Sequence, residues 1–345
     1  MSDKIKLLVL DDSLLFREVM AQGFKNDDLI EIVGVANDPF EATEKILSLE
    51  PDVITCDIEM PRMDGIKFVR HLMSQNPLPV IVLSSLATGA FESTDAGALD
   101  FVKKPDNLSG DLSKFFSDLR ENIIAASQAK FAFRRRENTG IYIECEGVKG
   151  IVDPNKIIAI GASTGGTDAI NSMLTKFSSN MPGIVVVQHM PAGFTQLYAQ
   201  RLDEVSNLSV KEAEDGDEVI PGRVLIAPGD FQMTIVKKAI GYAVRCDKTP
   251  KVNGHRPSVD ILFKSVADVA GQDAIGVILT GMGVDGAEGL KKIRDFGGYT
   301  LGQDERSSVV YGMPMAAYMM GAVMLQLPLY RLSDEILRKL NSMLY

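Results

Sequence analysis

A serine, a histidine and an aspartate in the second half of the chain have the types and positions of a nucleophile, a base and an orienting acid. Ser163 lies within Gly161-Ala162-Ser163-Thr164-Gly165, the G-x-S-x-G pattern of a nucleophile elbow. His189 directly follows an apolar run, and Asp285 follows another in a glycine-rich loop. A histidine can take the serine proton near neutral pH, and a carboxylate can fix the imidazole tautomer. These residues predict a serine hydrolase with no cofactor in this site.

Backbone groups near Ser163 are expected to stabilise the oxyanion that its attack would form. The first N–H groups of the following helix, beginning with Thr164, are one source, and the backbone of Met282 is another. The same glycine-rich loop could instead cradle a phosphate, as in dinucleotide-binding folds. His189 favours the hydrolase, because a ribose-binding enzyme is expected to place Asp or Glu after that strand.

Other chemically capable residues are interpreted as structural. His255 lies in a loop, residues 253–258, that is more typical of substrate contact or plain connection than of catalysis. Cys56 is interpreted as a buried sheet residue, and the three cysteines contain no C-x-x-C pair, so no zinc site or disulfide framework is predicted. Five methionines near the C-terminus are interpreted as core filling rather than a binding surface: Met313, Met315, Met319, Met320 and Met324.

A second set of polar residues follows apolar runs in the first half of the chain. Asp11 and Asp12 follow the first run, Asp57 the third, Ser84 the fourth and Lys104 the fifth. Three carboxylates at one sheet edge repel one another unless a hard cation lies between them, and Mg²⁺ is the natural candidate. A carboxylate beside Mg²⁺, a hydroxyl and a lysine can attack a phosphorus atom. The pattern predicts a phosphorylation site.

The elements that must position these residues are alternating strands and helices. Five apolar runs alternate with helical patterns within about the first 125 residues, which predicts a parallel sheet with helices on both faces. Further apolar runs predict a second, doubly wound parallel sheet: residues 156–160, 183–187 and 274–279. Function in such sheets gathers at the carboxyl ends of the strands. The predicted α/β domains are residues 1–126 and 153–345, joined by a linker over 127–152.

Composition excludes several classes of protein. At ~150 residues per domain, 345 residues suggest two or three domains. The hydrophobic share of 46% and charged share of 24% exclude a disordered chain. A net charge of −10 disfavours nucleic-acid binding as the main activity. We expect neither an export signal nor a membrane span, and the cysteine content fits a reducing cytosol.

Both sets of residues resemble known families. The acidic pair, Asp57 in segment 57–65, Ser84 and Lys104-Pro105 resemble the receiver domain of two-component response regulators. The second half closely resembles the chemotaxis protein-glutamate methylesterases, the CheB family. Five segments carry this second resemblance: Gly161 to Gly166, Val187-Gln188-His189-Met190-Pro191, Pro228-Gly229-Asp230, Arg256-Pro257-Ser258-Val259-Asp260 and Leu279-Thr280-Gly281-Met282-Gly283.

The resemblance implies a flavodoxin-like receiver joined to a hydrolase domain in a cytoplasmic, monomeric enzyme. Such enzymes hydrolyse glutamate methyl esters on methyl-accepting chemotaxis receptors, release methanol, and deamidate certain receptor glutamines. A chemotaxis histidine kinase is the implied phosphodonor to Asp57, and phosphorylation would relieve obstruction of the esterase site. Ser84 and Lys104 would support this transfer. The expected Mg²⁺ ligands are Asp11, Asp12, Asp57 and Glu59.

Two other classes compete with the enzyme. One is a phosphorylation-controlled protein that docks on receptors without hydrolysing anything, which intact Ser163, His189 and Asp285 argue against. The other is a transcriptional response regulator, which would need a helix-turn-helix with a basic face. The alternating pattern of the second half disfavours that class.

Overall fold

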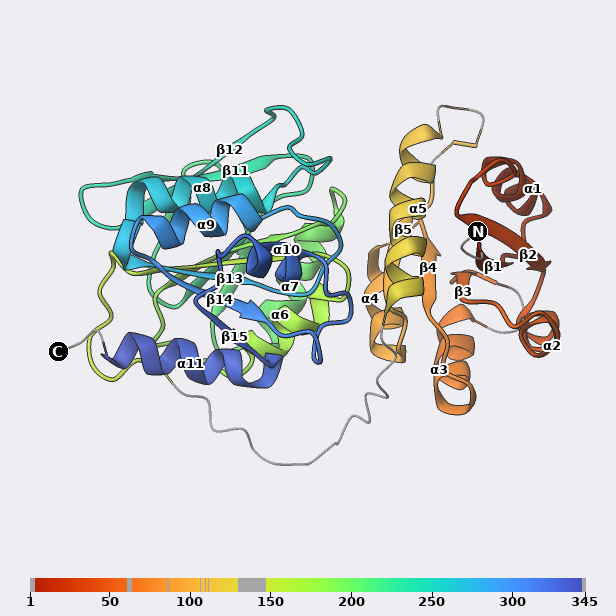
Figure 1. Ribbon diagram of the computed structural model, residues 1–345, viewed down its shortest axis with the longest axis horizontal. Helices are drawn as coiled ribbons and strands as arrows, with labels where there is room; N and C mark the ends of the chain where they lie inside the picture. The colour runs from red at the N-terminus through yellow and green to blue at the C-terminus, as the bar shows by residue number, and fades with distance from the viewer. Residues whose placement is uncertain are drawn as a thin grey trace. The chain divides into compact units, whose positions relative to one another are not determined.

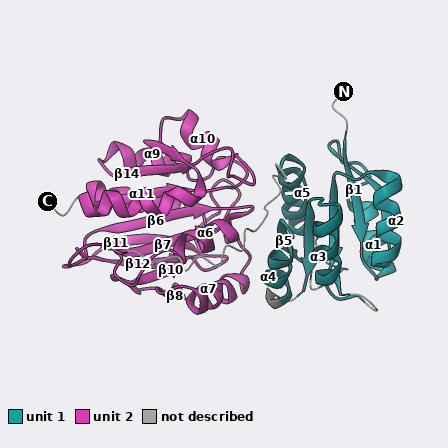
Figure 2. Cartoon of the chain, turned by 90° about the horizontal axis from the view of Figure 1, so that it is seen from below, with its two compact units in different colours: residues 1–134 teal, residues 135–345 magenta. Residues whose placement is uncertain are grey.

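The chain forms two compact units, residues 1–134 and 135–345 (Figure 2). The computed structural model describes residues 4–60, 64–85, 87–105, 107–108, 110, 112–129 and 147–342. Most of the predicted linker lies outside the described residues, so its boundaries stay a prediction. Within the described parts, no helix has the length and apolar character needed to cross a bilayer.

The first unit is the predicted five-stranded parallel sheet, with strand order β2-β1-β3-β4-β5 (Figure 1). Its strands are β1 (Ile5–Leu10), β2 (Ile30–Ala36), β3 (Val53–Asp57), β4 (Val80–Ser84) and β5 (Asp100–Lys103). Its helices are α1 (Leu14–Gly23), α2 (Pro39–Leu49), α3 (Gly65–Gln75), α4 (Ala87–Ala96) and α5 (Ser113–Gln128). The central strands β3 and β4 are buried along their whole length, which is typical of a parallel sheet covered on both faces.

Local sequence signals explain where helices in this unit begin. The carboxylate of Asp38 accepts hydrogen bonds from the N–H groups of Phe40 and Glu41, both at 2.9 Å, and Pro39 occupies the first turn of α2. Along α1 and α5, apolar side chains at helical spacing pack against β1 and β4 to form the core. This core supports the strands whose ends carry Asp57 and Ser84.

The second unit is built on a seven-stranded parallel sheet of order β15-β14-β13-β6-β7-β10-β8. Its strands are β6 (Ile157–Ala162), β7 (Gly183–Gln188), β8 (Ser209–Glu212), β10 (Arg223–Ile226), β13 (Ala274–Ile278), β14 (Tyr299–Gln303) and β15 (Leu325–Leu327). Its helices are α6 (Gly166–Leu174), α7 (Phe194–Val205), α8 (Val259–Ala270), α9 (Ala287–Asp295), α10 (Met313–Met319) and α11 (Leu329–Ser342), with a short turn η1 (Gly271–Asp273). Helices α8 and α9 lie on one side of the sheet and α6 and α11 on the other (Figure 1).

A second, smaller sheet in this unit was not predicted. Strands β11 (Gln232–Lys237) and β12 (Tyr242–Asp247) form an antiparallel hairpin, which pairs with β9 (Glu218–Val219). This small sheet packs against α8 and contributes buried side chains to the core of the unit. The strand order places β13, β6 and β7 next to one another. The residues that follow these three strands therefore share one edge of the sheet, which is where Ser163, His189 and the loop to Asp285 lie.

Candidate active site

Ser163 lies in the sharp turn between β6 and α6. Gly165 precedes α6 in the left-handed region, with a φ of 75° that favours glycine. The N–H of Ser163 donates to the carbonyl of Thr280 at 3.0 Å, and the Ser163 carbonyl accepts from the N–H of Gly166. A Cβ atom on Gly281 would lie 2.7 Å from the Cβ atom of Ser163. The candidate nucleophile is thus fixed between its own turn and the loop after β13.

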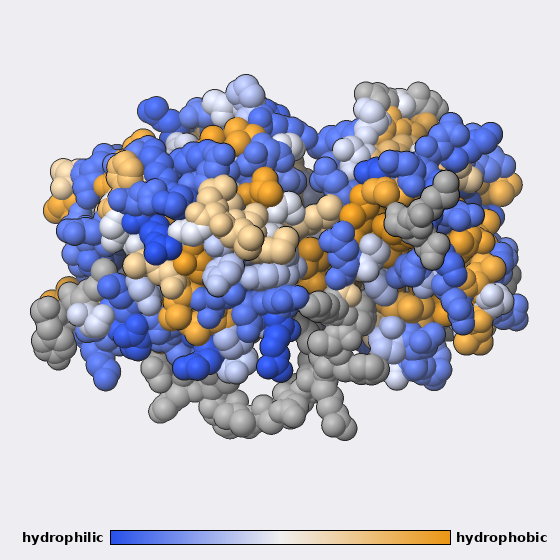
Figure 3. Space-filling view, viewed as in Figure 1, coloured by the Kyte–Doolittle hydropathy of each residue, from blue (hydrophilic) through white to orange (hydrophobic). Residues whose placement is uncertain are grey.

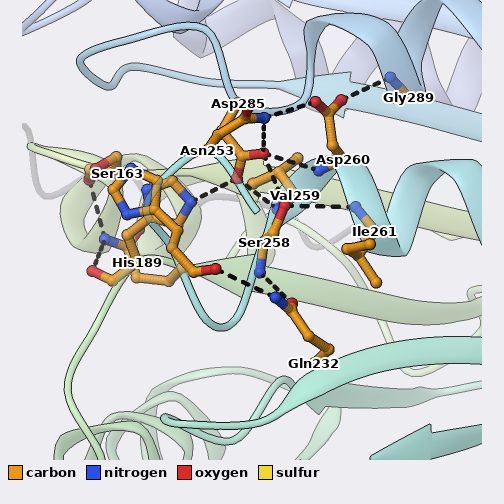
Figure 4. Close-up of polar contacts among 12 residues, drawn as sticks. Ser163, His189, Gln232, Asn253, Ser258, Val259, Asp260, Ile261, Asp285 and Gly289 are labelled. Carbon is orange, nitrogen blue, oxygen red and sulfur yellow. Dashed lines mark hydrogen bonds and ion pairs between the residues drawn. The ribbon is translucent and has the colours of Figure 1, made fainter. Parts of the chain in front are cut away.

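A glutamine side chain ties the candidate nucleophile to the candidate base. The N–H of His189 donates to the carbonyl of Ala162 at 3.1 Å, across the pair β6 and β7. The buried Nε2 of Gln188 donates to the carbonyl of Ser163 at 3.0 Å and to that of His189 at 3.3 Å. Figure 4 shows Ser163 and His189 together at one end of this network. Their relative position is therefore set by backbone bonds as well as by packing.

The hydrogen bond of His189 to Asp285 determines which ring nitrogen is basic. Nε2 of His189 lies 2.8 Å from Oδ2 of Asp285. An ionised carboxylate only accepts hydrogen bonds, so Nε2 must carry the proton and Nδ1 is the basic nitrogen. Nδ1 is buried and has no hydrogen-bond partner within the described residues, the Ser163 hydroxyl included. The acceptor atom of the candidate base is thus available, as proton transfer from a nucleophile requires.

Five hydrogen-bond donors surround the Asp285 carboxylate, which is almost completely buried. Oδ2 accepts from His189 and from the N–H of Val259 at 2.7 Å. Oδ1 accepts from the Ser258 hydroxyl at 2.8 Å, the Asn253 amide at 2.9 Å and the Asp260 N–H at 3.2 Å. Burial alone would raise the pKa of Asp285, but the hydrogen bond from His189, with those from Asn253 and Ser258, holds it well below its usual range. Asp285 is therefore ionised at any working pH.

A second buried carboxylate, that of Asp260, lies behind Asp285. The Asn253 amide donates to both, reaching Oδ2 of Asp260 at 2.8 Å, and the N–H of Gly289 donates to Oδ1 of Asp260 at 2.7 Å (Figure 4). Burial, with the nearby charge of Asp285, raises the pKa of Asp260. Asn253 adopts a left-handed φ of 52°, which this short polar side chain tolerates. One amide therefore separates two carboxylates that would otherwise repel each other.

His255 lies against the candidate base, which the sequence interpretation did not foresee. Its ring stacks on that of His189, with centroids 3.7 Å apart and planes 13° from parallel. Burial, together with the nearby His189, lowers the pKa of His255 to about 3. His255 is therefore neutral at working pH and covers one face of the His189 ring with a flat, uncharged surface.

The predicted oxyanion donors lie beside Ser163. The N–H of Ser163 itself is already bonded to Thr280, so it does not serve this role. Thr164 is buried at the start of the turn, and its carbonyl accepts from the Thr280 hydroxyl at 3.0 Å. Met282 follows Gly281 in the loop that packs on Ser163 and is partly exposed. Both residues are close to the candidate nucleophile, and their role as donors stays a prediction.

Sequence reasoning missed several residues of this network. Gln188, Asn253 and Ser258 were noted only as parts of motifs, without a contact to the site. Ser258 both caps α8 and binds Asp285. A signal was present, because Asn, Ser and Asp clustered in a loop before an apolar helix are suited to capping and to holding a buried carboxylate. The contact of this loop with Asp285 was not predicted, because more than twenty residues separate the two along the chain.

The interpretation of the C-terminal methionines as core filling is wrong for four of the five. Met313 is fully buried, but Met315, Met319, Met320 and Met324 are 45–79% exposed. Helix α10 has only seven residues and buries only one of its faces. Its other face carries methionine and tyrosine at positions where most surface helices carry charge.

The first unit brings the predicted acidic residues together. Carboxylate oxygens of Asp11, Asp12 and Asp57 all lie within 4.8 Å of one another. Nζ of Lys104 lies 2.7 Å from both Oδ2 of Asp11 and Oδ2 of Asp57. The carboxylate of Glu59 is not part of this cluster; its backbone N–H donates to Oδ1 of Asp57 at 3.3 Å.

Hard oxygen donors converging from the ends of β1 and β3 fit a Mg²⁺ ion, whose preferred ligands are carboxylates and water. Ser84 is buried at the end of β4, and its carbonyl accepts from the N–H of Lys104 at 2.9 Å. Burial, reinforced by the Asp11 charge, raises the pKa of Asp57, although Lys104 opposes the shift. Burial would lower the pKa of Lys104, but its bonds to the two aspartates raise it. The site therefore holds more negative charge than one lysine balances.

This imbalance predicts that Asp57→Asn stabilises the first unit at neutral pH without Mg²⁺. A raised pKa means that the folded state binds the proton more tightly, so stability falls as pH rises through that pKa. The asparagine cannot ionise, so the variant does not lose stability in this way. Its higher stability relative to wild type should disappear well below pH 3.8, the ordinary pKa of the group. Calorimetry of the full chain in EDTA at several pH values measures the effect.

The eight tyrosines all lie at position 142 or later. A thermal transition that changes tyrosine absorbance therefore belongs to the second unit, and the remaining transition belongs to the first. A lower melting temperature for Asp57→Asn at neutral pH would show that the bond from Lys104 outweighs the cost of burying the charge.

Comparison with known proteins identifies the family of each unit. Residues 158–336 match the model of the CheB methylesterase family, and residues 7–111 match that of the response regulator receiver domain. A protein-glutamate methylesterase/protein-glutamine glutaminase from Syntrophomonas wolfei is 50% identical over 99% of each chain. One of the same name from Syntrophotalea carbinolica is 48% identical over 93% of each chain.

A solved structure gives a consistent result. The CheB methylesterase catalytic domain of Thermotoga maritima is 42% identical, with a TM-score of 0.52, and the match covers 53% of this chain and 98% of that one. The receiver match precedes the methylesterase match in this chain, and the two curated relatives match nearly its whole length. The chain therefore belongs to the CheB methylesterase family, with a response regulator receiver domain preceding its methylesterase domain.

Proposed function

We propose that this protein is a serine esterase that hydrolyses glutamate γ-methyl esters on methyl-accepting chemotaxis receptors and deamidates receptor glutamines. The observation that carries the proposal is the arrangement of His189, whose Nε2 is bonded to a buried ionised carboxylate while Nδ1 remains available beside Ser163. The curated relatives carry both activities in their names. Family membership and site geometry thus support the same reaction.

In the first half of the reaction, the Ser163 hydroxyl attacks the ester carbonyl carbon while Nδ1 of His189 takes its proton. The resulting imidazolium is stabilised by the Asp285 carboxylate across the 2.8 Å bond. The backbone N–H groups of Thr164 and Met282 are the proposed donors to the oxyanion, helped by the positive end of α6. The tetrahedral intermediate then collapses, and Nδ1 returns the proton to the departing methanol.

In the second half, water attacks the acyl enzyme. Nδ1 of His189 takes a proton from the water, and the collapse of the second intermediate returns that proton to Ser163. With a glutamine substrate the same steps release ammonia in place of methanol. Both substrates leave a glutamate carboxylate as product, so one site can carry out the two named activities.

We propose Asp57 as the phosphoacceptor and a chemotaxis histidine kinase as its donor. Asp11, Asp12 and Asp57 would hold Mg²⁺, and Lys104 bonds the Asp57 oxygen directly. When bound, the ion would neutralise charge between the carboxylates and the incoming phosphoryl group. Lys104 and Ser84 would contact the transferred phosphoryl group. A cytoplasmic location follows from these proposed partners.

The test of the esterase is methanol release from methylated receptor signalling domains by the full chain. We expect release that depends on enzyme concentration, with wild-type receptor glutamines converted to glutamate in parallel. A docking protein that hydrolyses nothing is the alternative class. It would bind the receptors and release no methanol even when Asp57 is phosphorylated.

Phosphorylation is expected to raise esterase activity. Beryllofluoride with Mg²⁺ mimics the phosphoryl group on an aspartate, and we expect it to increase the rate of methanol release by about 5–150-fold, the usual range of coupling between two sites. Asp57→Asn is the matched control, because it lacks the oxygen to which beryllofluoride binds. Equal rates of the wild type with and without the mimic would exclude control of the esterase by Asp57.

A further inference from the structure

An uncharged surface borders the candidate nucleophile on its α10 side. Gly281, which packs on Ser163, also accepts the N–H groups of Gly312 at 3.1 Å and Met313 at 2.8 Å, so α10 begins at this loop. At 1.5 Å per residue, α10 extends only about 10 Å from that point. The whole of α10 therefore lies within about one short helix length of the turn that holds Ser163.

The exposed residues of this region are apolar. Met315, Tyr318 and Met319 share one face of α10 because their spacing is i, i+3 and i+4. After α10 the chain turns at Gly321, where its N–H donates to the carbonyl of Tyr318 at 2.9 Å. We name the whole surface the methionine face, and its members are 45–79% exposed: Val284, Met315, Tyr318, Met319, Met320 and Met324. In Figure 3 pale orange side chains gather where Figure 1 places α10.

The charge pattern indicates what kind of surface this is. Although 24% of the chain is charged, every residue from 307 to 330 is uncharged. Exposed apolar patches of this kind mark interaction sites, and depletion of charge is typical of the centre of a protein interface. Methionine is flexible and polarisable, so a surface rich in it can adapt to different apolar partners.

We propose that the methionine face is the docking surface for an apolar stretch of the substrate protein that flanks the methylated glutamate. The inference rests on the proposed esterase function, since that function places the substrate protein at Ser163. The occupant is apolar because a charged flank would be desolvated without a partner on this surface. The adaptable side chains let one enzyme accept glutamates with different apolar neighbours.

The chemistry of the reaction agrees with this occupant. The ester substrate is neutral, whereas the product glutamate is ionised. An uncharged surface beside Ser163 therefore favours the methylated form and disfavours the product, which helps the product leave. A surface lined with lysine or arginine would do the opposite and retain the carboxylate.

The test compares Met319→Glu and Met324→Glu with wild type in the full chain. The two positions lie on either side of the turn at Gly321, and Met319 is 79% exposed, so neither change should disturb folding. Ile240→Glu is the matched control, because Ile240 is 74% exposed in the turn between β11 and β12, outside the methionine face. Initial rates of methanol release are measured against the concentration of methylated receptor domain.

We expect each methionine variant to lower kcat/KM for the receptor by about tenfold or more, mainly through KM, since a buried charge replaces a buried apolar contact. Ile240→Glu should stay within about twofold of wild type. A small fluorophosphonate that labels Ser163 reports the site without needing the methionine face. Its labelling rate should be unchanged in all variants.

Other results would overturn the proposal. Unchanged kcat/KM in both methionine variants would show that the substrate docks elsewhere, and slowed fluorophosphonate labelling would show that the changes distort the site. Faster demethylation by the unphosphorylated methionine variants than by unphosphorylated wild type would mean that another part of this chain covers the methionine face. A sedimentation coefficient that differs between wild type and the methionine variants would show that a second copy of this chain binds the methionine face. If wild type labels at Ser163 but releases no methanol, the proposed function fails instead.

Discussion

Ser163→Ala is expected to lower kcat for methanol release by about 10⁴–10⁶-fold. The variant lacks the oxygen that forms the acyl enzyme, and neither His189 nor the oxyanion donors can replace it. Residual hydrolysis would come only from binding and from stabilisation of the tetrahedral intermediate by backbone donors. Methanol release from methylated receptor domains, measured with excess enzyme to detect slow turnover, gives the ratio.

Loss of activity in Ser163→Ala should be free of structural effects. Among the described residues, the hydrogen bonds of Ser163 involve its backbone: its N–H donates to Thr280, and its carbonyl accepts from Gly166 and Gln188. Alanine keeps each of these bonds, so thermal stability should match wild type. Ser163→Cys is the matched control, because its thiol can still attack and should retain part of the activity. An alanine variant as active as wild type would remove Ser163 from the mechanism.

The sequence predicted the five strands of the first unit and the central strands β6, β7 and β13 of the second, because burial leaves a direct mark on composition. In a parallel sheet covered on both faces, strands read as unbroken apolar runs, and the residues after them lie at one edge. Ser163 and His189 follow β6 and β7, which are hydrogen-bonded neighbours. That adjacency was predictable, since consecutive strands pair more often than not.

The order of the remaining strands was not predictable in the same way. Strand β13 pairs with β6 although more than a hundred residues separate them. The long connection between them includes the hairpin of β11 and β12, whose strands are only partly buried and give a weaker signal. The contact of His189 with Asp285 depends on this order, so the sequence could suggest that Asp285 reaches the site but could not place it.

Contacts made by loops were the least predictable part of the site. The stacking of His255 on His189 joins residues 66 positions apart, and it depends on a loop in which Asn253 has a positive φ. No periodic pattern encodes such a loop. The exposed methionines were missed for a related reason, because hydrophobicity predicts burial on average but cannot show that a seven-residue helix buries only one face.

Asp285→Asn is expected to lower kcat by about 10⁴-fold while leaving receptor binding nearly unchanged. Every group around the carboxylate is a donor, so an amide NH2 must face a donor whichever way it is turned. At the Oδ2 position it would face His189 and force the proton from Nε2 to Nδ1, which removes the base. At the Oδ1 position it would face the amide of Asn253. In both orientations the negative charge that stabilises the imidazolium is gone.

Ser258→Ala separates the charge of Asp285 from its hydrogen bonds. This variant removes one donor to Oδ1 and the cap of α8, at a cost of about 1 kcal/mol in stability. It leaves the carboxylate ionised and the bond to His189 in place, so its loss of kcat should be far smaller than that of Asp285→Asn. Comparable losses in the two variants would mean that the position of the loop matters more than the charge. If Asp285→Asn instead keeps more than about a tenth of wild-type kcat, the carboxylate does not hold the tautomer, and the low pKa of Asp285 reflects only the packing of donors around a buried acid.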